Sequence, residues 1–359
     1  MRNKADNQLA QTTRPTTETT KNTGRRPIRG TQNPLASSAL LAALAILGTS
    51  LLAIPATSSR AETHPRRQPP QAENSTEQWR AELARWRQAH ADHISAPDGW
   101  LSLVALDWLK PGTNTVGHAN DNSIPLLGNA PEHLAVIDVE ASSLVLQAPA
   151  GGFPPALRIN GKPVTPGVIY ADDATPPDTS STLTDQNLEL LALHRGDRYA
   201  LRIKDATSPA RLAFRGLNWY PPNPAFRITA RWIPFPPGHT AQIPTVIGTT
   251  LKLPAPGLAE FTLKGKTIQL EPVLEEPGAT QLFFILRDAT SHSTTYQASR
   301  FLYTNLPDHG LDQPGSVVLD FNRLENPPCA YTPYATCPLP PFENRLPIAL
   351  EAGEKRYRP

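Results

Sequence analysis

LELLALHRGDRYALRI, residues 188–203, contains two apolar runs on either side of a short polar turn. Arg195, Gly196 and Asp197 separate the runs, and a short glycine-containing connection between two such runs is typical of a β-hairpin. Each run has the length of an ordinary strand. The stretch therefore predicts two adjacent antiparallel strands, and it sets the pattern for the rest of the chain.

Similar short β-rich runs, divided by turn residues, continue in both directions from this hairpin. Asn160 and Gly161 form a strong hairpin signal, and Lys264-Gly265-Lys266 joins two further runs. The other runs expected to be strands are 101–109, 134–139, 143–147, 156–159, 226–233, 261–263, 267–270, 282–286, 294–303 and 317–321. The predicted fold class is mostly β, with two β-sandwich-like domains preceded by one amphipathic helix.

The helix is expected just ahead of the first strand. Ser75 with Gln78 three residues later is a capping-box pattern. Trp79, Leu83 and Trp86 then recur at helical spacing, which predicts a helix from near Ser75 to near residue 94. We expect its aromatic stripe to pack against the body of the protein rather than to form a binding face.

The domain organisation follows from length and composition. Residues 1–61 are expected to be an export signal or a membrane anchor, and residues 62–74 a polar tether. The remaining chain is long for one domain, so we expect an N-terminal β domain over 75–205 and a C-terminal β domain over 206–359. The proline-rich stretch 209–224 is the best candidate for the junction.

The N-terminal segment predicts export. Arg25, Arg26 and Arg29 precede an apolar run over residues 35–56, and Ala61 follows as a candidate cleavage point. Because the run is long enough to cross a bilayer, a retained anchor in the cytoplasmic membrane is the alternative to a cleaved signal. In both cases the basic side stays in the cytoplasm, so the rest of the chain is expected in the periplasm or outside the cell.

Composition narrows the class of function. The chain has 359 residues, 39% of them hydrophobic, and 40 prolines, which indicates a globular protein rich in turns. Its formal net charge of +2 and the lack of a basic stripe argue against a nucleic-acid partner. The sequence leaves the oligomeric state open.

The two cysteines, Cys329 and Cys337, enclose seven residues. Oxidising compartments form and keep disulfides, so the expected export favours a bridge between them. The alternative is a nucleophilic or redox-active thiol, which requires a lowered pKa. Two cysteines without nearby histidines do not make a structural zinc site, and no metal or other cofactor is predicted.

The C-terminal block is the candidate ligand site, because it gathers polar side chains in a stretch with little periodicity. Loops of this kind on rigid scaffolds often carry binding and catalysis. The alternative is that these side chains satisfy backbone groups that no strand can reach. The candidates are Asp320, Asn322, Arg323, Asn326, Tyr331, Tyr334, Asn344, Arg345, Glu351, Glu354 and Lys355.

The same block resembles a known family. NPPCAYTPYATCPLPP at 326–341, NRL at 344–346 and EAGEK at 351–355 are similar to the C-terminal signature of the bacterial domain-of-unknown-function family sixteen eighty-four. Further matches include 95–104 and 108–112, so the resemblance extends over about residues 77–359. It implies a shared fold unit and supplies no activity, cofactor or catalytic residue. The signature also occurs on proteins without export segments, which weakens the argument for a disulfide.

A second resemblance concerns the N-terminal β domain. Residues 114–126, with Gly117 and His118, look like the opening of a forkhead-associated β-sandwich. That family reads phosphothreonine through an arginine after this glycine and a later Ser-Arg-x-His segment. Here His118 replaces the arginine and no such segment follows, so the resemblance implies the fold without phosphopeptide recognition.

Three function hypotheses remain. No nucleophile elbow, phosphate-binding loop, dinucleotide fingerprint or zinc-protease helix is present. The first hypothesis is therefore an envelope protein that binds a carbohydrate, lipid or peptide through the C-terminal block. The second is an envelope hydrolase with Asp320, Glu351 or Glu354 as acid–base groups and Arg323 or Arg345 holding an anionic group. The third is thiol redox chemistry at the two cysteines.

Overall fold

The computed structural model describes residues 71–174 and 179–358, and these form one compact unit. The expected export signal or anchor over 1–61, and the tether up to residue 70, lie outside the described residues. In the part that is described, no helix combines the length and the apolar character needed to cross a bilayer.

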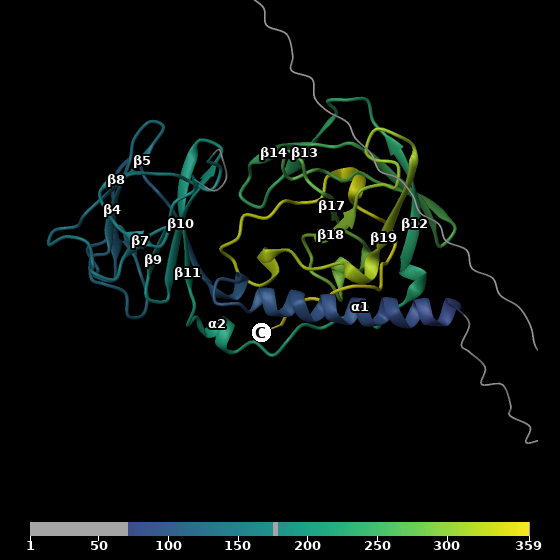
Figure 1. Cartoon of the computed structure of the whole chain (residues 1–359), viewed down its shortest axis with the longest axis horizontal. Coiled ribbons are helices and arrows are strands. Elements are labelled where there is room, and N and C mark those ends of the chain that lie inside the picture. The colour runs from purple at the N-terminus through teal and green to yellow at the C-terminus, as the bar shows by residue number, and fades with distance from the viewer. Residues whose placement is uncertain (1–70, 175–178, 359) are drawn as a thin grey trace, which may run out of the picture. The chain divides into compact units, whose positions relative to one another are not determined.

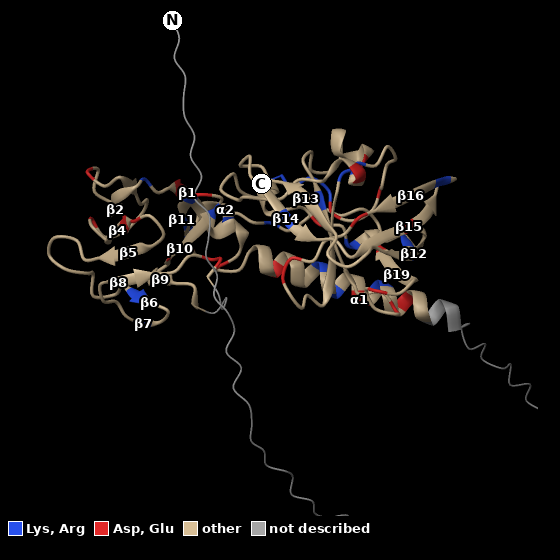
Figure 2. Ribbon diagram, turned by 90° about the horizontal axis from the view of Figure 1, so that it is seen from above, with Lys and Arg blue, Asp and Glu red and all other residues tan. Residues whose placement is uncertain are grey.

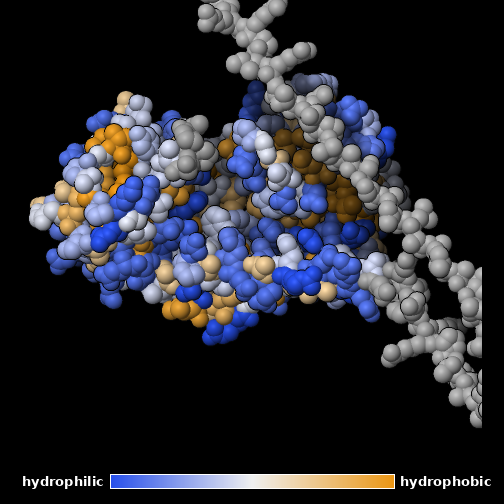
Figure 3. Space-filling model, in the orientation of Figure 1, coloured by the Kyte–Doolittle hydropathy of each residue, from blue (hydrophilic) through white to orange (hydrophobic). Residues whose placement is uncertain are grey.

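Helix α1 (Gln71–Ile94) opens the described chain and confirms the expected amphipathic helix, although it begins ahead of Ser75. Its inner face is buried, with Trp79 8% and Leu83 0% exposed. The Trp79 Nε1 donates to Asp320 Oδ2 at 2.7 Å, and Arg87 donates to the backbone carbonyls of Tyr220 and Asn322. Figure 1 shows α1 running beneath β17 to β19, and Figure 3 shows that its outer face is mostly hydrophilic.

The first half of the described chain is a sandwich of two sheets. Their strand orders are β1-β11-β10-β9-β6-β7 and β3-β2-β4-β5-β8, and side chains from both sheets share one hydrophobic core. The elements are η1 (Trp100–Ser102), β1 (Leu103–Trp108), β2 (Gly112–Gly117), β3 (Ile124–Pro125), β4 (Ala135–Val139), β5 (Leu144–Gln147), β6 (Arg158–Ile159), β7 (Lys162–Pro163), β8 (Gly167–Ile169), β9 (Thr182–Asp185), β10 (Leu188–Arg195) and β11 (Arg198–Asp205).

The second half is also built from strands, which form a four-stranded sheet, β16-β15-β12-β19, and two hairpins, β13-β14 and β17-β18. Side chains of β12, β15, β16 and β19 pack with those of β17 and β18 in one core. The elements are α2 (Pro209–Leu212), η3 (Pro224–Phe226), β12 (Arg227–Pro234), β13 (Thr240–Pro244), β14 (Thr250–Pro254), β15 (Gly257–Leu263), β16 (Lys266–Leu270), β17 (Gln281–Leu286), η4 (Ala289–His292), β18 (Arg300–Asn305), β19 (Gly315–Asp320), η5 (Phe321–Arg323), η6 (Pro328–Ala330) and η7 (Phe342–Asn344).

The fold class predicted from the sequence is thus confirmed, and its three hairpins form where expected. Asn160 and Gly161 both adopt positive φ, 48° and 75°, at the turn between β6 and β7. The other two hairpins join β10 to β11 and β15 to β16. The predicted strand over 294–303 is wrong in its first half. Residues 294 and 295 donate backbone N–H groups to Thr290 O, so that segment is a turn and pairing begins at Arg300.

Charged residues of both signs are interspersed over the described elements, as Figure 2 shows. Helix α1 carries acidic and basic residues side by side along its length.

Candidate functional site

The C-terminal block is hydrogen-bonded to strand β18 at Glu325, one residue before the family signature begins. The backbone N–H of Glu325 donates to Phe301 O, and Phe301 N–H donates back to Glu325 O, each at 3.0 Å. This bridge follows directly after η5, whose N-terminus is capped by the Asp320 side chain. The local structure therefore fixes Glu325 and Asn326 beside the strand.

Gly353 allows the end of the C-terminal block to pack against Leu324. Its φ is +76°, and a Cβ there would lie 2.5 Å from Leu324 O. Only glycine tolerates both the conformation and the close approach. The next residue, Glu354, then donates its N–H to Leu324 O at 2.7 Å, which places its side chain next to Asn326.

Glu354 is the centre of a buried polar cluster and is only 1% exposed. Its Oε1 accepts from the Tyr331 hydroxyl at 2.7 Å and from Asn326 Nδ2 at 2.8 Å. Its Oε2 accepts from the Asn326 backbone N–H at 2.8 Å. These three bonds satisfy the polar atoms of the buried carboxyl group.

His90 of α1 lies between two carboxylates. Its Nδ1 is 3.4 Å from Glu325 Oε2, and its Nε2 is 3.4 Å from Glu354 Oε2. The ring also stacks on Trp86 at 5.6 Å and meets the edge of Trp219 at 5.9 Å. Burial lowers the pKa of His90, but the hydrogen bond to Glu354 and the charges of both carboxylates outweigh burial and raise it. The arrangement favours a protonated imidazolium held by both glutamates.

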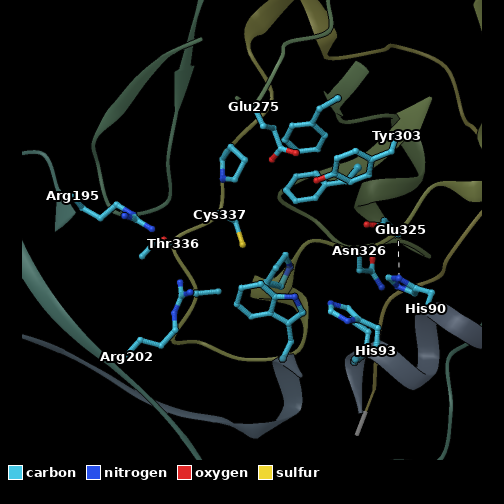
Figure 4. Close-up of a pocket in the computed structure, with 17 residues that line it drawn as sticks. His90, His93, Arg195, Arg202, Glu275, Tyr303, Glu325, Asn326, Thr336 and Cys337 are labelled. Carbon is cyan, nitrogen blue, oxygen red and sulfur yellow. Dashed lines mark ion pairs between the residues drawn. The ribbon is translucent and has the colours of Figure 1, made fainter. Parts of the chain in front are cut away.

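A cavity of about 430 Å³ opens beside this cluster. Figure 4 shows Arg195 and Arg202 on one side, and Glu275, Tyr303, Glu325, Asn326 and His90 on the other. Aromatic side chains of Trp100, Phe283, Phe301 and Tyr303 form much of the wall. This combination of apolar walls and a few polar groups is typical of sites for small molecules.

The acidic side of the cavity holds two protonatable carboxyls. Burial raises the pKa of Glu325 to about 7, with His90 opposing the rise and Glu354 and Glu275 adding to it. Burial also raises the pKa of Glu275, against a hydrogen bond from the Tyr303 hydroxyl. Glu325 is thus poised to gain or lose a proton near neutral pH.

The basic side contains one satisfied and one unsatisfied guanidinium. Arg195 is bound bidentately by Asp172, with N–O distances of 2.9 and 2.6 Å. Arg202 has no carboxylate within ion-pair distance among the described residues, and its buried Nε has no hydrogen-bond partner there. Burial lowers the pKa of Arg202, and the nearby charge of Arg195 adds to this effect. Arg202 is therefore the side chain on this wall that is available to an anion.

The two cysteines are adjacent free thiols in this structure, so the predicted disulfide is not formed in it. The backbone N–H of Cys329 donates to Cys337 Sγ at 3.1 Å, and Cys337 also lines the cavity. A hydrogen bond from the Cys337 thiol lowers the pKa of Cys329 despite burial. The same bond, together with burial, raises the pKa of Cys337. Cys329 is therefore the more acidic of the two thiols, and a bridge under oxidising conditions stays a prediction.

We expect iodoacetamide to alkylate Cys329 before Cys337 in the native protein, because the thiolate is the reacting form. Peptide mass spectrometry after short exposures measures both rates. Replacing Cys337 with alanine removes the donor and is expected to slow Cys329 several-fold at pH 7, whereas Cys337→Ser retains a donor and serves as the control. Faster labelling of Cys337 in the native protein would contradict this assignment.

Three of the candidates taken from the sequence meet in this cluster, namely Asn326, Tyr331 and Glu354. Asp320 and Asn322 instead hold the chain together elsewhere. Asp320 accepts from Trp79 and Asn322, and the Asn322 amide bonds both backbone groups of Asn223. Arg323 lies near Asp320, with its guanidinium 5.7 Å from the centre of the Trp86 ring.

The remaining candidates lie away from the cavity. Asn344 bonds backbone groups of Glu271 and Ile285, and Arg345 donates to Pro340 O. Lys355 lies over the Tyr220 ring at 4.7 Å. Tyr334 and Glu351 are exposed. The structure therefore divides the proposed set into a cluster at the cavity and side chains in other surroundings.

Four residues of the site are not among the candidates taken from the sequence: His90, Arg202, Glu275 and Glu325. Glu325 lies between the candidates Arg323 and Asn326, so its position was a usable signal. His90 follows Trp86 by four residues and shares its helix face, which the helical spacing also indicated. Arg202 and Glu275 carry no local signal. No group of three or more histidine, cysteine or carboxylate side chains suited to a metal occurs in the described part of the chain.

Comparison with known proteins agrees with the resemblance seen in the block. Residues 212–355 match the family described as "Protein of unknown function (DUF1684)". Among solved structures, the chain is similar to the solution NMR structure of an uncharacterized protein from Haloarcula marismortui, with 28% identity and a TM-score of 0.35, over 40% of this chain and 78% of that one. No curated protein matches the chain. Over residues 212–355, the chain is therefore similar to the DUF1684 family.

Proposed function

We propose that the protein binds a small organic anion in the cavity beside Glu325, with the anionic group on Arg202. The observation that carries this proposal is the unpaired guanidinium of Arg202 on the wall of a cavity of about 430 Å³. Volumes of this size accommodate metabolite-sized ligands.

The energetics of a half-buried guanidinium support an anionic ligand. Arg202 has given up part of its hydration, and the other charge on this wall, Arg195, is already neutralised by Asp172. A carboxylate or phosphate would supply the missing partner through charge-assisted hydrogen bonds, for which the planar guanidinium is well suited. Arg202 also lies 5.4 Å from the centre of the Trp100 ring, which restricts where its donors point.

The aromatic wall supports a ligand with an apolar or planar body. Phe283 packs edge-on against Phe301 and is stacked on Tyr303, at 4.8 and 4.6 Å. These rings line the cavity, and Tyr303 lies on its acidic side, as Figure 4 shows. Of the carbohydrate, lipid and peptide classes expected from the sequence, the proposal therefore favours small members that carry a carboxylate or phosphate.

The C-terminal block contributes to the proposed binding site, because Glu325, Asn326 and Cys337 line the cavity. The hydrolase hypothesis is less well supported. Asp320 and Glu354 bond to different partners, Glu354 is buried, and Glu351 is exposed, so these three carboxylates do not act on one ligand. The proposed place of action outside the cytoplasm depends on residues 1–61 and stays a prediction.

Titration of the full-length protein with phenylacetate and its neutral analogue phenylacetamide, followed by NMR, tests the proposal. We expect phenylacetate to bind and phenylacetamide to bind more weakly. Arg202→Gln is expected to weaken phenylacetate binding about tenfold or more, since charged hydrogen bonds are worth about 1.5–3 kcal/mol.

Arg198→Gln is the matched control. Arg198 lies on the same strand, has the same charge and does not line the cavity; it stacks on Trp108 at 3.9 Å. This variant is expected to bind phenylacetate as the native protein does. Equal affinity for the acid and the amide, or equal loss in the two variants, would refute anion binding at Arg202.

A further inference from the structure

We infer that the ligand also carries an ammonium group, so that the cavity takes a small zwitterion: a short peptide or an amino acid with free amino and carboxyl ends. This inference rests on the proposed function, since it retains the carboxylate on Arg202. It adds a second recognition point on the opposite side of the cavity, formed by Glu325, Glu275 and Asn326.

The first argument is a charge deficit on that side. Glu325, Glu275 and Glu354 place three carboxyls around one cation, His90. His90 is shared between Glu325 and Glu354, at 3.4 Å from each. Glu275 accepts from the neutral Tyr303 hydroxyl and has no cationic partner within ion-pair distance among the described residues. A ligand ammonium would supply the missing positive charge where the cavity is already walled by acids.

The second argument is an unsatisfied acceptor. Asn326 is 2% exposed, and its Nδ2 is committed to Glu354 Oε1 and Lys355 O, both at 2.8 Å. Its Oδ1 has no hydrogen-bond partner among the described residues, and Asn326 lines the cavity. Buried acceptors without a donor are costly and uncommon, so a ligand donor that reached this oxygen would be stabilising.

The third argument is proton coupling. The charged and titratable groups that face Glu325 come from α1, the β16–β17 connection, β18 and the signature block, and they are His90, Glu275, Tyr303, Tyr331 and Glu354. With these neighbours, burial raises the pKa of Glu325 to about 7, so the carboxyl is partly protonated at neutral pH. An ammonium beside it favours the charged form, and binding would therefore release a proton from Glu325.

A dipeptide series tests the inference on the full-length protein by isothermal titration calorimetry. Alanyl-phenylalanine has both charges, its N-acetyl derivative lacks the ammonium, and its C-terminal amide lacks the carboxylate. We expect the free dipeptide to bind about tenfold or more tightly than either blocked form, because each loses a charged hydrogen bond worth about 1.5–3 kcal/mol. Titrations at pH 7 in Bis-Tris and in Tris, whose ionisation enthalpies differ and which carry no anionic group, are expected to show release of about half a proton.

Glu325→Gln is expected to abolish the proton release and to weaken the free dipeptide, while leaving the N-acetyl form unchanged. Glu351→Gln, which removes an exposed carboxylate, is the matched control and should retain both properties. Arg202→Gln should reduce the advantage of the free dipeptide over its amide.

The outcomes separate the two proposals. If the N-acetyl form binds as tightly as the free dipeptide, or if no proton is released, the zwitterion inference is wrong while anion binding stands. If the amide binds as tightly as the free dipeptide, the proposed function itself fails. Absence of binding by all three compounds, in a protein that binds phenylacetate, also overturns the inference.

Discussion

Replacing Asp288 with alanine is expected to lower the free energy of unfolding by about 3–5 kcal/mol, because it leaves a fully buried arginine without a carboxylate. Arg300 and Asp288 both have side chains with 0% exposure, and they form an ion pair at 2.8 Å. Asp288 also accepts from Thr290 N–H and Oγ1 and from Leu350 N–H. The loss therefore combines an uncompensated charge with several orphaned donors.

This ion pair also supports the candidate site. The terminal nitrogens of Arg300 also donate to the backbone carbonyls of Leu350, at 3.0 Å, of Ala352, and of Glu354, at 3.4 Å, whereas its Nε has no partner among the described residues. These residues lead directly into Gly353 and Glu354, whose side chain binds Asn326 and Tyr331. Weakening the anchor at Arg300 is therefore expected to loosen the wall of the cavity, as well as to destabilise the fold.

Urea unfolding followed by tryptophan fluorescence measures the effect. Glu260→Ala is the control, because Glu260 forms an ion pair with Arg231 at a similar distance, 2.6 Å, but at the surface. Exposed pairs contribute little, so the control should unfold close to the native protein. Comparable destabilisation by the two substitutions would show that burial does not give the Arg300 pair its importance.

Local sequence signals were sufficient for most of the fold. The three hairpins were predictable because glycine sits where the turn requires it, as at Gly161 with φ of 75°. Helix α1 was predictable from the spacing of Trp79, Leu83 and Trp86. The prediction of a strand over residues 294–299 is wrong because β-branched and aromatic residues, which favour strands, also occur in turns. There, side-chain and backbone bonds to Thr290 outweigh strand propensity.

The candidate site was only partly predictable, because it joins segments far apart in the sequence. Asn326, Tyr331 and Glu354 of the block meet in one cluster, whereas the amides of Asn322 and Asn344 bond backbone groups, which is the alternative stated for the block. His90 approaches Tyr331 across 241 positions, and no periodicity encodes such a contact. Arg202 belongs to the other half of the described chain. The forkhead-associated resemblance of that half stays a prediction.

The effect of Glu325→Gln on the free energy of unfolding, relative to the native protein, is expected to be more favourable at pH 8 than at pH 5. Most substitutions at a buried polar site do not behave in this way. The pKa of Glu325 is raised from its ordinary value of 4.5 to about 7. A carboxyl with a raised folded-state pKa contributes stability that is fully present below about pH 4.5 and is lost as the pH rises through about 7. Glutamine imitates the protonated carboxyl and does not ionise, so the variant avoids this loss.

The expected size follows from the shift. The difference in the free energy of unfolding between the variant and the native protein should shift by about 2–3 kcal/mol in favour of the variant from pH 5 to pH 8. This value follows from linkage over the interval between the two pKa values. The raised pKa of His90 adds a loss of the same sign in the native protein above about pH 6.5. Part of that second loss disappears in the variant, since Glu325 is one of the charges that raise it.

Urea titrations at pH 5, 6, 7 and 8 give the required curves, with Glu351→Gln as a control that removes an exposed carboxylate from the same block. The control curve should run parallel to that of the native protein, whereas the Glu325→Gln curve should diverge from it mainly between pH 5 and pH 7 and less between pH 7 and pH 8. Parallel curves for all three proteins would mean that Glu325 ionises in the folded state as easily as in the unfolded chain. Ionisation of Glu325 in the folded protein would then not be unfavourable, and a ligand ammonium would gain no binding energy by making it easier.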